Sequence, residues 1–348
     1  MKYQPLTAAE VKSVIEGKGA AKRVPVFVHF WTHPEACEEE KARKIQAILD
    51  DYPQDADVYF LNIPSVYDAP KEDPGYRWSY RDEEKREGKA LDHAGFIKDW
   101  DEELEKLLKD FPSPDYPGLI PEKHPDDGRY KIGCWWYFFF ERFWSIRNME
   151  DALMDFYDNP EAVHKVFRKL CDFYIRMIER AKEELDLDGI FTSDDLGTQT
   201  GTFFSTEIFD EFFAPYYKEI IDKVHGLGMH FWLHTCGNIE NFMSRYIELG
   251  VDVIHPIQKH TMDEQRIAEK YGNQITIWAG FDVQYTIPFG TPEEVRKEVR
   301  YLVDTYQRPE GRFMFTLGNG TTADLPAESL QALMDEIFIC GAKALTGE

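Results

Sequence analysis

Short apolar runs alternate with long amphipathic segments through the second half of the chain, and this alternation limits the fold more than any other feature. After residue 185 five runs have the length and the β-branched or aromatic content of strands: DGIFTSDD, MHFWLHTCG, VDVIHPI, ITIWAGFD and RFMFTLGNG. Helix-start signals follow them, as at Thr291-Pro292-Glu293-Glu294, where a capping box coincides with proline at the first helical position. Such repetition predicts parallel strands with helices packed outside.

We therefore predict a (β/α)₈ barrel that forms one domain over residues 1–348. A chain of 348 residues with 43% hydrophobic side chains can bury a core of that size. Residues 66–130 are rich in Asp, Glu, Lys and Pro and have no clear apolar face, so we expect an excursion that covers one end of the barrel. Strands are expected near 24–31, 58–64, 188–194, 229–235, 251–256, 275–281 and 311–317, with one more within 130–146.

Polar residues close the predicted strands, and the carboxyl ends of barrel strands are where such folds hold their chemistry. His234 and Cys236 are two residues apart, so in an extended strand they project to the same side, about 6 to 7 Å apart. Imidazole with thiolate suits zinc. On spacing alone, a buried cysteine and a hydrogen-bonded histidine remain the more ordinary interpretation. The other residues at these ends are Asp194, Asp195, His255, Gln258, Asp282 and Asn319.

Charge and composition exclude several classes of partner. The formal net charge is −24 with a pI near 4.8, which disfavours binding to nucleic acid or to an anionic membrane surface. No apolar stretch reaches the roughly 18 to 20 residues that span a bilayer. The run CWWYFFFERFW is too short and is interrupted by Glu141 and Arg142. Five scattered cysteines and the absence of a signal-peptide pattern at the N-terminus favour a cytoplasmic protein without disulfides.

A family resemblance is carried by the run TSDDLGTQTGTFFSTEIFDEFFAPYYKEIIDKVHGLGMHFWLHTCGNIENFMSRYIELGVDVIHPIQ, followed by WAGFD and FTLGNGTTADLPAESLQAL. Over roughly residues 130–345 the chain resembles the uroporphyrinogen decarboxylase superfamily, which also contains corrinoid-dependent methyltransferases. The resemblance implies a (β/α)₈ barrel with its pocket at the carboxyl ends of the strands. This agrees with the prediction from the strand and helix pattern.

Two positions indicate which branch of the superfamily the chain resembles. The decarboxylases have an arginine-rich stretch after their first strand, whereas this chain reads VPVFVHFWTHPEACEEE, whose acidic residues would repel a polycarboxylate. The zinc methyltransferases have a His-x-Cys pair that His234 and Cys236 match. Their third ligand, a cysteine near the end of the last strand, is missing from Leu317-Gly318-Asn319-Gly320. The resemblance therefore leaves two hypotheses open. Either the site binds zinc with a further ligand from Asp194, Asp195, His255 or Asp282, or it has no metal.

The function that the resemblance favours is methyl transfer from a small methoxylated donor, preferably aromatic, to the corrinoid of a separate carrier protein, assisted by zinc at His234 and Cys236. No Asp-x-His-x-x-Gly corrinoid signature occurs in the sequence, and a homodimer remains an option. A metal-independent decarboxylase of a small aromatic or pyrrolic acid and a non-catalytic binding protein are the alternatives. Asp195 or Asp194 is expected to supply a proton, and the expected substrate-binding residues are Gln199, His255, Gln258, Asp282 and Asn319.

Overall fold

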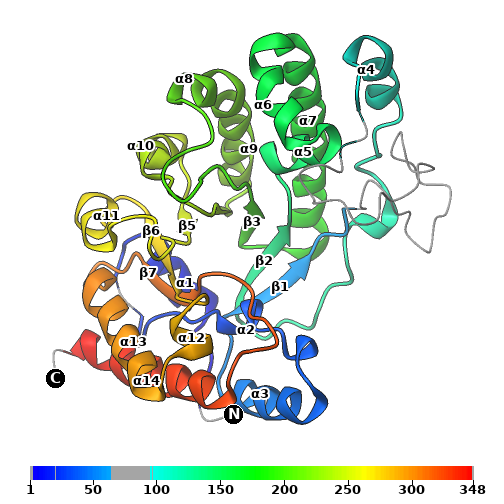
Figure 1. The fold of residues 1–348 in the computed structure, drawn as a ribbon. Helices are drawn as coiled ribbons and strands as arrows, with labels where there is room; N and C mark the ends of the chain where they lie inside the picture. The colour runs from blue at the N-terminus through cyan, green and yellow to red at the C-terminus, as the bar shows by residue number, and fades with distance from the viewer. Residues whose placement is uncertain (1–2, 20, 64–94, 96, 347–348) are drawn as a thin grey trace.

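Seven parallel strands pair in the order of the chain to form the centre of the molecule (Figure 1). The computed structural model describes residues 3–19, 21–63, 95 and 97–346. Because every strand is parallel and each neighbour follows in sequence, the sheet curls into the predicted α/β barrel. The strands are β1 (Ala56–Phe60), β2 (Tyr130–Trp135), β3 (Gly189–Ser193), β4 (His230–His234), β5 (Val253–His255), β6 (Thr276–Phe281) and β7 (Phe313–Leu317).

The segment from Pro25 to Phe27 fills the eighth position, between β7 and the start of β1. The Phe27 N–H donates to the Phe315 carbonyl at 3.0 Å, and the Phe315 N–H donates to the Pro25 carbonyl at 2.9 Å. On the other side the Asp55 N–H donates to the Val26 carbonyl at 3.2 Å. Backbone bonds on both sides therefore close the barrel, although the segment forms only an isolated bridge with β7.

Two strand predictions need correction at this end of the chain. The strand expected over 24–31 ends after Phe27, because Val28–Trp31 forms a short helix, α2, in which the Thr32 hydroxyl donates to the Val28 carbonyl. The helix lets the adjacent rings of Phe30 and Trp31 pack against each other at 4.9 Å near the barrel axis, whereas a strand would turn them apart. The strand expected near 58–64 runs from Ala56 to Phe60.

Helices surround the strands (Figure 1). α13 begins at the predicted capping box, in which the Thr291 side chain and Glu294 bond each other's backbone N–H. Three further short elements are η1 (Pro34–Ala36), η3 (Pro117–Leu119) and η4 (Phe209–Phe213). The remaining helices are α1 (Ala8–Ile15), α3 (Glu39–Asp51), α4 (Trp100–Lys109), α5 (Phe140–Arg147), α6 (Met149–Asp158), α7 (Pro160–Leu185), α8 (Thr206–Ile208), α9 (Ala214–Gly226), α10 (Glu240–Leu249), α11 (Glu264–Tyr271), α12 (Thr286–Phe289), α13 (Pro292–Tyr306) and α14 (Ala327–Thr346).

Aromatic rings fill the barrel interior, where branched aliphatic side chains are more usual. Trp232 of β4 packs edge-on to Phe27 at 5.5 Å and to Trp278 of β6 at 5.3 Å, and Phe191 of β3 meets Trp278 at 5.3 Å. Trp278 also lies 4.6 Å from the ring of His255 at the end of β5. The aromatic core therefore forms a rigid floor beneath the carboxyl ends of the strands.

Of the expected excursion at 66–130, residues 66–94 and 96 lie outside the described residues. Its described part includes α4, which packs on the outer helices: the Trp100 indole N–H donates to Asp155 Oδ2 of α6 at 2.8 Å. Whether the excursion covers one end of the barrel therefore stays a prediction. No helix in the described ranges combines the length and the apolar character that a bilayer span needs.

The buried Asp55 carboxylate joins the N-terminal segment to the closing strand, and its removal is expected to be costly. It has no exposed surface and accepts bonds from Leu6 N–H (2.7 Å), Val26 N–H (2.8 Å) and the Arg23 guanidinium (2.6 Å). We predict that Asp55→Ala lowers the free energy of unfolding by about 3 to 5 kcal/mol, because it leaves the arginine buried and unpaired. Chemical denaturation measures this. The control is Arg43, which forms an exposed ion pair within its helix. Arg43→Ala should change the free energy of unfolding by less than about 1 kcal/mol.

Candidate functional site

A cavity of about 350 Å³ lies at the carboxyl ends of the strands, and we call it the mouth cavity. Residues from α2, α5, four strand ends and the loop after β7 contribute to it, as expected for a barrel whose strands all end on one side. Five of the lining side chains are aromatic rings of Phe, Trp or Tyr, and none of the described lining residues is a lysine or arginine. The lining residues are Phe30, Trp31, His33, Phe60, Trp136, Tyr137, Glu141, Ser193, Asp195, His234, Asn319 and Gly320.

Three potential metal ligands meet beside the mouth cavity. Cys236 Sγ lies 3.3 Å from His234 Nε2, and Asp195 Oδ1 lies 3.5 Å from the same nitrogen. All three ligand atoms fall within 4.8 Å of one another. Donor atoms bound tetrahedrally at zinc distances are separated by about 3.3 to 3.6 Å, so this arrangement fits one zinc ion with a position left open. Of the four candidates for a third ligand, Asp195 is the one in reach.

A hydrogen-bond chain fixes the tautomer of His234. His255 Nε2 lies 2.9 Å from the Leu317 carbonyl, which only accepts, so this nitrogen donates. Burial lowers the pKa of His234, and burial with the neighbouring His234 lowers the pKa of His255 well below its usual value. Neutral His255 therefore accepts at Nδ1 from the Nδ1–H of His234 at 2.8 Å. This assignment from the network leaves His234 Nε2 unprotonated toward Cys236 and Asp195, the form that a zinc ligand needs.

Two glycines bring the ligand loops together. The loop after β3 carries Asp195 and Gly197, and the loop after β4 carries Cys236 and Gly237. A Cβ on Gly197 would lie 2.6 Å from the Cys236 carbonyl oxygen, and Gly237 has a φ of +85° and faces the Gly197 backbone. At these two glycines the loops therefore touch backbone to backbone. Across this contact the Cys236 N–H donates to Asp195 Oδ1 at 2.7 Å.

Asp194, expected as a catalytic residue, points away from the mouth cavity. It is fully buried and accepts from the Phe139 N–H (3.2 Å), the Glu141 N–H (2.9 Å) and the Tyr217 hydroxyl (2.7 Å). Burial raises its pKa to about 6, against the opposing effect of these hydrogen bonds. Adjacent residues in an extended chain face opposite sides, so only Asp195 turns toward the cavity. In the structure Asp194 holds the start of α5 in place.

Glu141 is a site residue that was not predicted from the sequence, where it only interrupts an apolar run. It is 8% exposed, lines the mouth cavity, and accepts a 2.5 Å bond from the Ser193 hydroxyl. Burial, with the charges of Asp195 and Asp194, raises its pKa well above the usual value. A raised pKa favours the protonated form of the side chain, which can donate a proton. An acid in an apolar run soon after a strand end is the signal that could have identified it.

Of the five expected substrate-binding residues, only Asn319 lines the mouth cavity, with its amide nitrogen 3.7 Å from Cys236 Sγ. His255 lies behind His234. Gln258 accepts from the Gly237 N–H at 2.6 Å and so holds the cysteine loop. The Asp282 carboxylate accepts backbone N–H groups at the start of α12, and Gln199 is exposed on the loop after β3. These last four side chains do not reach the cavity because they serve neighbouring loops or solvent.

Comparison with known proteins decides the family. The model of the uroporphyrinogen decarboxylase (URO-D) family matches residues 144–338, more than half of the chain. The chain belongs to this family. Two curated methyltransferases are also similar in sequence. Methylcobamide:CoM methyltransferase MtbA of Methanosarcina mazei is 26% identical over 129 residues, which are 37% of this chain and 36% of the relative. The protein of the same name from Methanosarcina acetivorans is 27% identical over 129 residues, with the same coverage.

A solved structure extends the likeness of fold to nearly the whole chain. A methyltransferase from Methanosarcina mazei superposes with a TM-score of 0.60 at 13% identity, covering 96% of this chain and 99% of that one. The predicted membership of the superfamily is confirmed. The two sequence alignments span only 36% of each curated relative.

The contact between the two glycines gives a test of the ligand geometry. We predict that Gly197→Ala lowers zinc affinity by about 10- to 100-fold while the fold is retained, because the new methyl group pushes Asp195 away from Cys236. Gly201→Ala, in the same loop but with no atom within 4 Å of its added Cβ, should bind zinc like the wild type. Competition titration with a chelator measures both affinities. Equal loss in both variants would mean that the glycine contact does not set the geometry.

Proposed function

We propose that this protein transfers a methyl group from a small methoxylated molecule to the corrinoid of a separate carrier protein, with zinc held by His234, Cys236 and Asp195. The observation that carries the proposal is the placement of three zinc-type ligands beside a cavity with aromatic walls, with Cys236 and Asp195 each at tetrahedral spacing from His234. The likeness to two methylcobamide:CoM methyltransferases supports the same class of reaction.

The donor atoms favour an ether as substrate. When bound, zinc supplies a Lewis acid that withdraws electron density from the oxygen bearing the methyl group. With Asp195 in place of a second cysteine, less electron density reaches the ion, so the site is a stronger Lewis acid than one with two thiolates. Such a centre suits a neutral ether oxygen better than a thiol, which gives a methoxylated donor preference over a thiol.

In the proposed step the chain's own residues bind, orient and protonate. The Co(I) corrinoid gives an electron pair to the methyl carbon, a Co–C bond forms, and the C–O bond breaks with its electrons on oxygen. The carboxylic acid of Glu141, positioned by the 2.5 Å bond from Ser193, gives its proton to that oxygen. The product is a free hydroxyl compound, and the Glu141 carboxylate is then reprotonated from solvent.

Aromatic walls support a planar donor. Phe30 and Phe60 are stacked with their centroids 5.6 Å apart and an interplanar angle of 9°, and Trp136 lies 5.9 Å from Phe30. A cavity of about 350 Å³ is at the small end of the usual range for ligand sites, which suits a single substituted ring. A methoxylated arene can pack on these faces while its oxygen reaches toward His234.

Uroporphyrinogen decarboxylation is disfavoured by the lining of the cavity. No lysine or arginine among the described residues lines it, and two of its residues, Glu141 and Asp195, are acidic. A substrate with many carboxylates would find no partner for its charges there. Decarboxylation of a less anionic acid, without metal, is the second candidate, and zinc analysis separates it from the proposal.

Cysteine replacement tests where the chemistry lies. We predict that Cys236→Ala loses bound zinc and lowers the rate of methyl transfer to cob(I)alamin by more than about 100-fold, since a direct ligand matters more than an outer partner. Cys340→Ala, half-buried in α14, should keep both. The assay uses a panel of methoxyarenes with CoM as a thiol comparison, and metal analysis accompanies it. Full transfer by Cys236→Ala, or equal activity with no zinc in the wild type, would refute the proposal.

The proton donor can be tested through the leaving group. We predict that Glu141→Gln slows demethylation of an unactivated methoxyarene by about 10²- to 10⁴-fold, the usual contribution of general acid catalysis. A methoxyarene with a nitro group in the para position leaves as a stable phenolate, so its rate should fall much less. Comparison of the two rates in wild type and variant gives the result. An equal loss with both donors would assign Glu141 to folding or binding instead.

A further inference from the structure

Exposed apolar side chains gather at the end of the barrel that holds the mouth cavity. Phe60 and Trp136, at the ends of β1 and β2, line that cavity and are 49% and 36% exposed. Tyr285 and Phe289, which follow β6, are 62% and 73% exposed. These four are among the seven exposed large hydrophobic residues in the described ranges, and water disfavours each of them there. The seven are Phe60, Trp136, Met154, Tyr157, Tyr285, Phe289 and Ile339.

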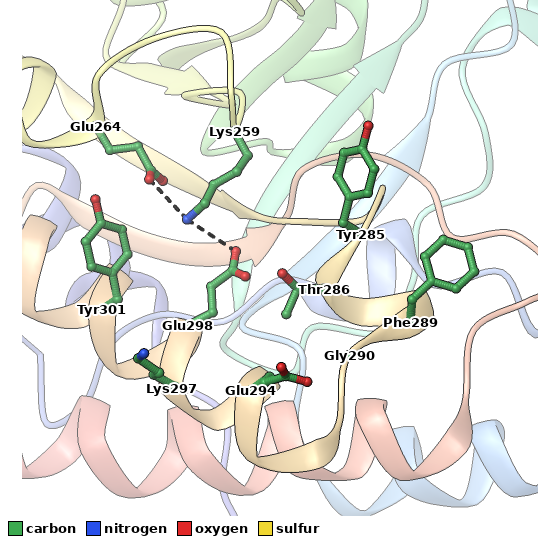
Figure 2. Close-up of a pocket in the computed structure, with 10 residues that line it drawn as sticks. All are labelled: Lys259, Glu264, Tyr285, Thr286, Phe289, Gly290, Glu294, Lys297, Glu298 and Tyr301. Atoms are coloured by element: carbon green, nitrogen blue, oxygen red, sulfur yellow. Dashed lines mark ion pairs between the residues drawn. The ribbon is translucent and has the colours of Figure 1, made fainter.

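Tyr285 and Phe289 border a second cavity of about 660 Å³, which we call the α12 pocket. Figure 2 shows the two rings on one side of it, with Lys259, Glu264 and Glu298 on the other. The pocket lies between α12, α13 and the loop that precedes α11, and the mechanism proposed above uses none of its residues. It is lined by Lys259, Glu264, Tyr285, Thr286, Phe289, Gly290, Glu294, Lys297, Glu298 and Tyr301.

The far wall of the α12 pocket is held by ion pairs. Lys259 Nζ lies 3.1 Å from Glu264 Oε2 and 3.5 Å from Glu298 Oε1, as the dashed lines in Figure 2 mark. The ammonium also sits 4.7 Å from the centre of the Tyr301 ring. These contacts tie the loop after β5 to α13, so the pocket has a preformed wall.

The aromatic side of the pocket is equally well supported. The Asp282 carboxylate accepts the N–H groups of Gln284 (2.9 Å) and Thr286 (3.1 Å), which fixes the start of α12. Tyr285 and Phe289 are thus presented on a held backbone with their rings in solvent. Rigid exposed aromatic anchors beside a pocket are typical of surfaces that bind another protein.

We propose that Tyr285, Phe289 and the α12 pocket form the docking site for the protein that carries the corrinoid. This proposal rests on the proposed function, in which cobalt reaches the mouth cavity on another protein. A stable protein interface covers roughly 800 Å² on each partner, a disc of about 16 Å radius, or more than three spacings between adjacent strands. β6 pairs with β7, and the loop after β7 supplies Asn319 and Gly320 to the mouth cavity. A carrier centred on that cavity therefore covers α12.

The direct test measures binding of the carrier rather than turnover. The probe is the corrinoid protein of the same organism, loaded with cobalamin and titrated into zinc-loaded enzyme by calorimetry. Phe289→Ala and Tyr285→Ala should each raise the Kd by about tenfold or more, as loss of an aromatic anchor does. Zinc content and the rate of methyl transfer to free cob(I)alamin should stay within twofold of wild type, since neither residue lines the mouth cavity.

Tyr157→Ala is the matched control, because Tyr157 is 69% exposed on α6 and does not line either cavity. Its Kd for the carrier should equal that of the wild type. An unchanged Kd in both α12 variants, or a wild type that does not bind the carrier, overturns the docking site. Dissociation of a homodimer by Phe289→Ala, seen by light scattering, also overturns it, because a second copy would then cover the face. If the wild type binds the carrier but transfers no methyl group, the docking site stands and the proposed function fails.

Discussion

One hydrogen-bond chain, from the Leu317 carbonyl through His255 to His234, determines what the site can do. It links the ends of β7, β5 and β4 across the barrel interior, and it sets which nitrogen of His234 carries the proton. The Trp31 ring stacks on His255 at 4.8 Å and keeps its plane fixed. Because a carbonyl cannot donate, the direction of the chain cannot reverse while both histidines are neutral. The barrel thus presents a lone pair at His234 Nε2 as a consequence of its closure.

Strand pairing supplies the rest of the alignment. In the parallel register Ser193 lies opposite His234, and His234 lies opposite His255. Three successive strands therefore end at one level, and the residues that follow them leave the barrel together. The Gly197 and Gly237 contact then turns the first two loops toward each other, so that Asp195 and Cys236 approach the same imidazole nitrogen. No long side chain is needed to bridge the gap.

Much of this arrangement could be predicted from sequence because it follows from local periodicity. Alternation of strand and helix gave the barrel, and the period of two gave His234 and Cys236 a common side. The strand predicted for the segment VPVFVHFW is wrong after Phe27. Its β-branched and aromatic residues favour a strand, whereas packing of Phe30 and Trp31 in the mouth cavity selects a helix. Tertiary contact overrides propensity where a chain enters a site.

The roles that sequence could not assign depend on distant partners. The neighbouring sequence does not indicate that Asp194 accepts a hydrogen bond from the backbone of Glu141, or that Gln258 accepts one from Gly237. Each of these contacts joins segments that follow different strands. Both residues close predicted strands, as Asp195 does, and their sequence positions look alike. The direction of each side chain is decided by which neighbouring loop has N–H groups left without a partner.

The charges in the mouth cavity bear on both the proposed metal site and the proposed substrate. Burial, then the charge of Asp195, raises the pKa of the Cys236 thiol well above its usual value, so without a cation the sulfur keeps its proton. A dication bound there would be balanced by one thiolate and one carboxylate. Among the described residues, no lysine or arginine lines the cavity. A neutral molecule loses least on entering such a site, whereas an anion would leave its solvent without gaining a partner. The same balance that favours metal at His234 and Cys236 therefore favours an uncharged ether as the methyl donor.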